Sequence, residues 1–202
     1  MRDYKILDIP NLKDIQNEIL SYIPIDRIVN EGKDIGADAN IRFMYPAKDI
    51  MANAPSLRNF FLDLKIDPES LGIGTNLTKP YTDARIHIDD IGSTFLSVNI
   101  PILNCENTKV FLYDLKDEVQ GVLTGQNNNK QRFFLFSEEQ CVKVDEFPTD
   151  TAYLFNTSSI HKFTNQNPTV RYMLLCRVPN RDLIGVSSCI SMLSYAGSNA
   201  LI

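Results

Sequence analysis

The pattern of apolar and polar positions changes character near residue 75. Before that point, two segments repeat apolar residues with the period of a helix. The first covers residues 11–23, with Asn11 as its N-cap and Pro24 as its stop. The second starts from Ser56 as its cap and forms one apolar face from Leu57, Phe60, Phe61 and Leu64. We expect both helices to brace the outside of a sheet.

After residue 75 the pattern predicts β-strands. Segments rich in aromatic and β-branched residues are separated by turn signals at fairly regular distances: 84–89, 94–102, 109–115, 132–136, 141–144, 151–155 and 170–178. A shorter strand candidate, 41–45, precedes them, and residues 25–40 show little pattern. No helical period follows residue 75, which favours antiparallel strands over βαβ units. A series of short strands of this kind is typical of a jelly roll.

The length of 202 residues suits one domain. Within it we expect a helical N-terminal bracing region (1–74), a β core (75–180) and a C-terminal tail (181–202). The fold class is therefore mainly β, with helices added at the N-terminal side. The sequence leaves the tail open between a docked helix and a segment that contacts a partner. The polar run 125–131 fits either a solvated turn or a lid over the substrate.

Composition and charge narrow the function classes. The net charge of −5, without any cluster of Lys and Arg, argues against a nucleic-acid surface. No apolar run approaches the roughly eighteen residues of a membrane helix, and the first residues lack the apolar segment of a secretory signal. The cysteine spacings fit neither a zinc site nor a disulfide scaffold. We therefore expect reduced thiols and a cytoplasmic location.

The candidate chemistry centres on His87 and Asp89. A strand points alternate side chains to the same face, so both residues can reach one point in space. His161 is the other histidine of the chain, and Arg171 lies ten positions beyond it. Two imidazoles and one carboxylate on one side of a metal form the 2-His-1-carboxylate facial triad of non-haem Fe(II) oxygenases. Arg171 then stands where a guanidinium can hold the far carboxylate of a keto-acid cosubstrate.

The order His-x-Asp, a late His and an Arg ten residues on resembles the 2-oxoglutarate- and Fe(II)-dependent dioxygenases. The block 99–108 looks like small members near the aspartyl/asparaginyl β-hydroxylase and prolyl hydroxylase branches. The resemblance covers roughly residues 75–180. It implies a double-stranded β-helix, which is the jelly roll of cupin-like proteins.

The resemblance also implies roles for individual residues. His87, Asp89 and His161 would be iron ligands, and Arg171 would bind the distal carboxylate of 2-oxoglutarate. Arg177 shares the strand parity of Arg171 and is the alternative for that role.

Further residues are candidates for the pocket wall. Asn99 and Tyr113 lie on the strands after the first ligands, where related enzymes place groups that hydrogen-bond 2-oxoglutarate. Arg85 shares the parity of His87, so its side chain is a candidate for a carboxylate or phosphate of the substrate. For all of these residues an ordinary structural role is equally open.

The sequence thus predicts a 2-oxoglutarate/Fe(II)-dependent dioxygenase, an oxidoreductase that uses molecular oxygen to hydroxylate a peptide side chain or a small molecule. Zinc or nickel in place of iron is open, because both bind such sites more tightly. The alternative is a non-catalytic jelly-roll module that keeps a vestigial metal site. A cupin-type metalloenzyme with three or more histidines is excluded, because the chain has two. The substrate and the oligomeric state are left open.

Overall fold

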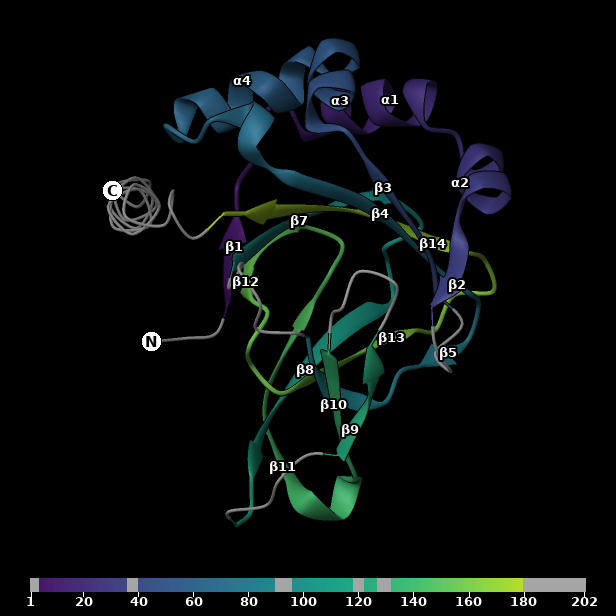
Figure 1. Cartoon of the computed structure of the whole chain (residues 1–202), viewed down its shortest axis with the longest axis vertical. Coiled ribbons are helices and arrows are strands. Elements are labelled where there is room, and N and C mark those ends of the chain that lie inside the picture. Colours follow the sequence, from purple (N-terminus) through teal and green to yellow (C-terminus); the bar gives the residue numbers. More distant parts are fainter. Residues whose placement is uncertain (1–3, 36–39, 90–95, 118–121, 127–131, 180–202) are drawn as a thin grey trace, which may run out of the picture.

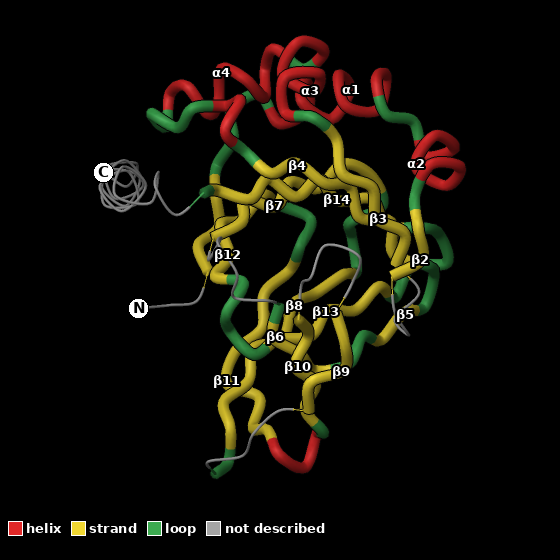
Figure 2. The backbone as a smooth tube through the Cα atoms, in the orientation of Figure 1, coloured by secondary structure: helices red, strands yellow, loops and turns green. Residues whose placement is uncertain are grey.

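The structure is a computed structural model that describes residues 4–35, 40–89, 96–117, 122–126 and 132–179. The expected tail, 181–202, lies outside these residues, as does most of the polar run 125–131. Within the described ranges the strands form two antiparallel sheets that face each other, with helices above one of them (Figures 1 and 2). The mainly β fold expected from the sequence is confirmed.

The first sheet has the strand order β1-β12-β7-β14-β4-β3-β2. Its strands are β1 (Tyr4–Leu7), β12 (Ala152–Asn156), β7 (Leu96–Leu103), β14 (Arg171–Val178), β4 (Gly72–Thr78), β3 (Asn40–Tyr45) and β2 (Lys33–Ile35). The second sheet has the order β11-β8-β13-β6-β10-β9, and β5 pairs with β13. Its strands are β11 (Cys141–Pro148), β8 (Thr108–Leu115), β13 (His161–Asn165), β6 (Ile86–Ile88), β10 (Arg132–Phe136), β9 (Val122–Gln126) and β5 (Thr82–Asp83).

The helices of the described chain cover the outer face of the first sheet (Figure 1). They are α1 (Leu12–Tyr22), α2 (Ile25–Glu31), α3 (Ala47–Asn53) and α4 (Pro55–Asp63), and short 3₁₀ turns follow at η1 (Pro68–Ser70) and η2 (Glu138–Gln140). Their apolar stripes join the sheet in one core, which contains the fully buried Ile15, Ile19 and Leu57. No helix in the described part is long and apolar enough to cross a membrane.

Strand β14 shows how the sequence separates the two faces of the first sheet. Successive side chains of a strand point to opposite faces. The even positions join the core beneath the helices: Tyr172, Leu174, Cys176 and Val178. The odd positions line the space between the two sheets: Arg171, Met173, Leu175 and Arg177. A strand in the middle of the sheet thereby carries two arginines into the interior of the protein.

Some predicted elements differ from the observed ones. Helix α4 begins at Pro55, so the predicted cap at Ser56 is wrong. Proline is well suited to the first helical position, because its fixed φ matches the helix and its missing N–H is not needed there. Ser56 instead hydrogen-bonds Glu18 through its backbone N–H and its hydroxyl. The seven-residue helices α2 and α3 were not predicted, because a helical period needs more residues to show.

Several strands were also missing from the sequence interpretation. The N-terminal region supplies β1 and β2, which were not predicted, to the first sheet, besides β3, which was expected at 41–45, and the helices expected there. Strand β13, which carries His161, has the sequence HKFTN and lacks the apolar alternation of a typical strand. Its polar side chains Thr164 and Asn165 are nevertheless buried. Asn165 donates hydrogen bonds to the carbonyls of Thr78, Lys79 and Thr169, which stabilise this polar strand.

Candidate metal centre

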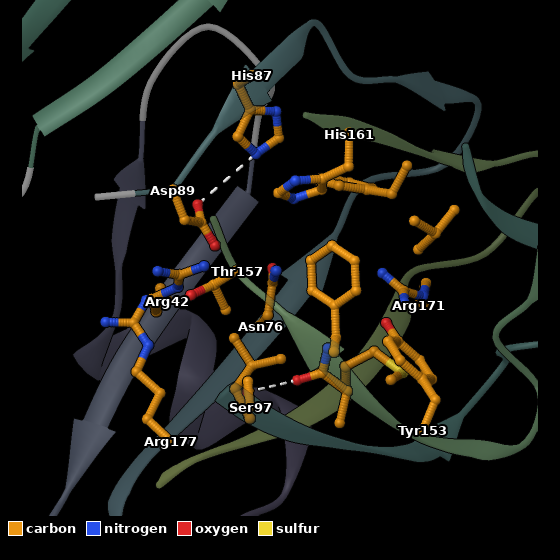
Figure 3. Close-up of a pocket in the computed structure, with 16 residues that line it drawn as sticks. Arg42, Asn76, His87, Asp89, Ser97, Tyr153, Thr157, His161, Arg171 and Arg177 are labelled. Atoms are coloured by element: carbon orange, nitrogen blue, oxygen red, sulfur yellow. Dashed lines mark hydrogen bonds and ion pairs between the residues drawn. The ribbon is translucent and has the colours of Figure 1, made fainter. Parts of the chain in front are cut away.

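A pocket between the two sheets brings the predicted ligands together (Figure 3). The second sheet contributes His87, which lies on β6, and His161, which lies on β13. Asp89 follows directly after the end of β6. The two histidines are direct partners in the register of β6 and β13, so their imidazole rings leave the sheet side by side. Their ring centroids are 4.3 Å apart.

The three side chains present their ligand atoms to one point. One nitrogen of each imidazole and one carboxylate oxygen of Asp89 all lie within 4.8 Å of one another. Within this group, His87 Nε2 lies 3.7 Å from Asp89 Oδ1. Ligand atoms that bind one first-row metal at about 2.1 Å and at right angles are about 3 Å apart. Small side-chain rotations therefore suffice to close the three atoms around an ion.

Both imidazoles are held in the tautomer that a metal requires. His87 Nδ1 lies 2.8 Å from the carbonyl oxygen of Arg85, and His161 Nδ1 lies 2.8 Å from the carbonyl oxygen of Ser159. A carbonyl only accepts hydrogen bonds, so each Nδ1 carries the proton and donates it. In the neutral ring Nε2 then has the lone pair that a metal needs, as in metal-binding histidines.

The surroundings of His161 and Asp89 favour the protonation states in which these side chains can bind a metal. Burial, together with the neighbouring His87, lowers the pKa of His161 from 6.5 to about 4, so its imidazole is neutral at pH 7. Burial alone would raise the pKa of Asp89, but His87, His161, Arg42 and Arg177 outweigh burial and lower it. Two imidazole nitrogens and one carboxylate are the donor set that Fe(II), Zn²⁺ and Ni²⁺ accept. The residues present therefore fit a divalent first-row metal.

Arg171 lies in the same pocket, at the end where Tyr153 also lies (Figure 3). Its side chain is 3% exposed. The Nη2 atom donates a hydrogen bond of 3.3 Å to Thr149 Oγ1, and the guanidinium lies 5.8 Å from the centre of the Phe163 ring. Among the described residues, the buried Nε finds no acceptor. A buried guanidinium with unused donors is suited to bind a carboxylate in two-pronged fashion.

The other predicted pocket residues divide into two groups. Asn99 lines the pocket, where its side-chain oxygen accepts a 2.7 Å hydrogen bond from Ser97. Tyr113 does not: it lines a separate cleft on the outer face of the second sheet. On β8 it is the neighbouring Leu112 that is buried in the interior, and Tyr113 has the opposite parity.

Arg85 is also outside the pocket, and its side chain is exposed. The parity argument fails for this residue because β6 begins only at Ile86, so the alternation of the strand does not extend to it. Its contribution to the site is its backbone carbonyl, which orients His87.

Sequence reasoning missed several residues that line the pocket: Arg42, Asn76, Ser97, Tyr153 and Thr157. Tyr153 is buried, and burial raises the pKa of its hydroxyl group, which hydrogen-bonds the side chains of Asn99 and Arg171. The parity of the predicted strands 41–45 and 151–155 is the signal that would have suggested Arg42 and Tyr153. To use this parity, one would have to know which face of each strand points into the protein.

Comparison with known proteins shows that the fold of the chain is a known one. No family model and no curated protein matches the sequence. The structure is similar to a prolyl-4-hydroxylase from Pseudomonas putida, with a TM-score of 0.50 and 12% identity over 89% of this chain and 93% of that chain. It is also similar to a prolyl hydroxylase from Trichoplax adhaerens in complex with a peptide fragment of the hypoxia inducible factor oxygen degradation domain. Here the TM-score is 0.50 and the identity 10%, over 92% of this chain and 86% of that chain. The chain therefore has the double-stranded β-helix fold of these prolyl hydroxylases, as the resemblance in its sequence predicted.

Proposed function

We propose that the protein is a 2-oxoglutarate- and Fe(II)-dependent dioxygenase that hydroxylates a peptide side chain or a small molecule. The observation that carries this proposal is the convergence of His87, Asp89 and His161 in the pocket that also contains the buried Arg171. A non-catalytic module with a vestigial site has no need of all four residues in these positions. The likeness in fold to two prolyl hydroxylases supports the same proposal.

Each residue has a defined task in this scheme. His87, Asp89 and His161 hold the metal on one side and leave positions free on the other. The bound iron, with 2-oxoglutarate and oxygen, supplies the oxidising chemistry that replaces a C–H bond by C–OH. The rings of Phe155 and Phe163 pack against the imidazoles, with Phe155 4.8 Å from His161 and Phe163 6.4 Å from His87 between ring centroids. These rings limit the access of water to the ligand atoms.

Arg171 is the residue proposed for the far carboxylate of 2-oxoglutarate. The hydroxyl groups of Thr149 and Tyr153 lie beside it and offer further hydrogen bonds to the same carboxylate. Asn99, which shares a hydrogen bond with Tyr153, orients that hydroxyl group. A dianionic cosubstrate thus finds one cation and several neutral donors at the end of the pocket away from solvent.

The proposal is tested by titrating metal-free protein with Fe(II) and then with 2-oxoglutarate in the absence of oxygen. Binding of 2-oxoglutarate to iron gives a visible absorption band, and admission of oxygen should convert 2-oxoglutarate to succinate. Zinc and nickel should bind the same three ligands and displace iron. If iron binds but no band forms with 2-oxoglutarate, the vestigial module is the better description. If no metal binds, both descriptions are wrong.

A further inference from the structure

Two further arginines, Arg42 and Arg177, lie in the pocket besides Arg171. Figure 3 shows Arg42 and Arg177 side by side next to Asp89, on the opposite side of the pocket from Arg171. They come from β3 and β14, which are separated in the sheet by β4. On β4, Arg42 is paired with Asn76 and Arg177 with Gly72, and the position between them on the same face is Gly74. The side chain of Met44, which pairs with Gly74 from β3, takes the space over this glycine: its sulfur would lie 2.7 Å from a Cβ at position 74.

The two guanidinium groups are placed at an electrostatic cost. Burial and the like charge of Arg177 lower the pKa of Arg42 from 12.5 to about 10. Among the described residues, the carboxylate that acts on both arginines is that of Asp89. The Nε of Arg42 is buried and has no hydrogen-bond acceptor in the described part of the chain. Buried donors and like charges of this kind are normally retained only where a partner of opposite charge is bound.

A count of charges shows that the pocket lacks negative charge even when the proposed metal and 2-oxoglutarate are bound. Three arginines and a divalent metal bring five positive charges to the described pocket, against one carboxylate from Asp89. 2-Oxoglutarate adds two negative charges, and Arg171 binds one of its carboxylates. The loaded site keeps an excess of two positive charges. The guanidinium groups that neither the metal ligands nor 2-oxoglutarate would occupy are those of Arg42 and Arg177.

We propose that Arg42 and Arg177 bind an oxyanion of the substrate, a carboxylate or a phosphate group, while Arg171 binds 2-oxoglutarate. This inference rests on the proposed function and adds the chemical class of the substrate. Guanidinium groups are suited to this task because their planar N–H pairs match carboxylate and phosphate oxygens. Two guanidinium groups that come from strands on either side of β4 can hold such a group from two directions and so fix the substrate beside the metal.

The test uses protein loaded with zinc and saturated with 2-oxoglutarate, so that the metal and Arg171 are occupied. Acetate and inorganic phosphate are then titrated by calorimetry at low ionic strength, and the stronger of the two indicates which oxyanion the site prefers. The variants are Arg42→Gln and Arg177→Gln, and Arg58→Gln is the control because it removes an exposed arginine of α4. We expect each pocket variant to weaken oxyanion binding at least tenfold, and the control to leave it unchanged.

Metal and 2-oxoglutarate affinities measured on the same variants separate the alternatives. They should stay within about threefold of wild type if the pair binds the substrate oxyanion. Loss of metal affinity with oxyanion binding unchanged would mean that the pair only orients Asp89. Loss of 2-oxoglutarate binding would assign the pair to the cosubstrate and overturn the inference, as would a wild type that binds neither probe. Arg42→Lys and Arg177→Lys, which keep the charge, serve if a glutamine variant does not fold.

Failure of the proposed function gives a different result. If wild-type protein binds no metal and no 2-oxoglutarate, the dioxygenase proposal is wrong whatever the probes do. Oxyanion binding to metal-free protein, lost in the two pocket variants, would then still show that the pair is an anion site.

Discussion

Replacement of Arg171 by alanine removes a buried cation from the pocket. The side chain is 3% exposed, so bulk water cannot take its place easily. The far carboxylate of 2-oxoglutarate would then be buried with only neutral donors, the hydroxyl groups of Thr149 and Tyr153. Metal binding should be nearly unchanged, because Arg171 is not part of the ligand cluster.

The size of the effect follows from the loss of one partner of a buried charge pair. Such a loss costs about 2–5 kcal/mol. This corresponds to a roughly thirty- to several-thousand-fold weaker affinity for 2-oxoglutarate. The neighbouring hydroxyl groups keep some hydrogen bonds to the carboxylate, so we expect a value in the lower half of this range. Arg171→Lys should lie between alanine and wild type, because an ammonium keeps the charge but cannot reproduce the two-pronged geometry.

The assay is the anaerobic titration of iron-loaded protein with 2-oxoglutarate, followed by visible absorption. Arg177→Gln is the matched control, because it removes an arginine from the same face of β14 at the other side of the pocket. Equal affinity for 2-oxoglutarate in Arg171→Ala and wild type would refute the assignment. A large loss in Arg177→Gln instead would move the cosubstrate to the opposite side of the pocket.

Three further predictions concern the ligands and the core. Asp89→Ala should abolish metal-dependent turnover of 2-oxoglutarate and weaken metal binding while the far-UV circular dichroism stays unchanged; loss of the fold would show a structural role. Metal-free protein should lose about 3 kcal/mol of stability as the pH falls from 6.5 to about 4, because the unfolded chain takes up a proton that buried His161 accepts only near pH 4. His161→Gln should lack this part of the pH dependence in thermal melts, and an unchanged profile would contradict the assignment. Leu174→Ala, at a fully buried position beneath the helices, should cost about 2–5 kcal/mol in denaturant unfolding, and intact 2-oxoglutarate binding is expected because the side chain faces away from the pocket.

The sequence predicted site residues well where these residues are close to one another along the chain. The spacing of His87 and Asp89 predicted that they lie together, although β6 ends at Ile88 and Asp89 follows it. The alternation of the last strand placed Arg171 and Arg177 on the same face, and both line the pocket. The same reasoning failed for Arg85, because the exact start of β6 decides whether parity applies and a strand boundary is hard to read from the sequence.

The rest of the site depends on pairing between distant parts of the chain. Arg42 reaches the pocket because β3 pairs with β4, and Tyr153 because β12 pairs with β7. No local pattern specifies which strands become neighbours or which face of a strand turns inward. Strand β13 was missed for a related reason: its burial comes from hydrogen-bonded polar side chains such as Asn165, and these do not produce an apolar pattern.

The contacts that orient the two imidazoles limit which side chains can replace them. Each ring donates its Nδ1 proton to a carbonyl only two residues earlier, that of Arg85 for His87 and that of Ser159 for His161. A carboxylate at either position has no proton to donate and would face the carbonyl oxygen with like partial charge. Exchange of a histidine for aspartate or glutamate would therefore disturb the backbone next to it as well as the metal. The carboxylate of the cluster is tolerated at Asp89 because His87, His161, Arg42 and Arg177 favour its charged form there.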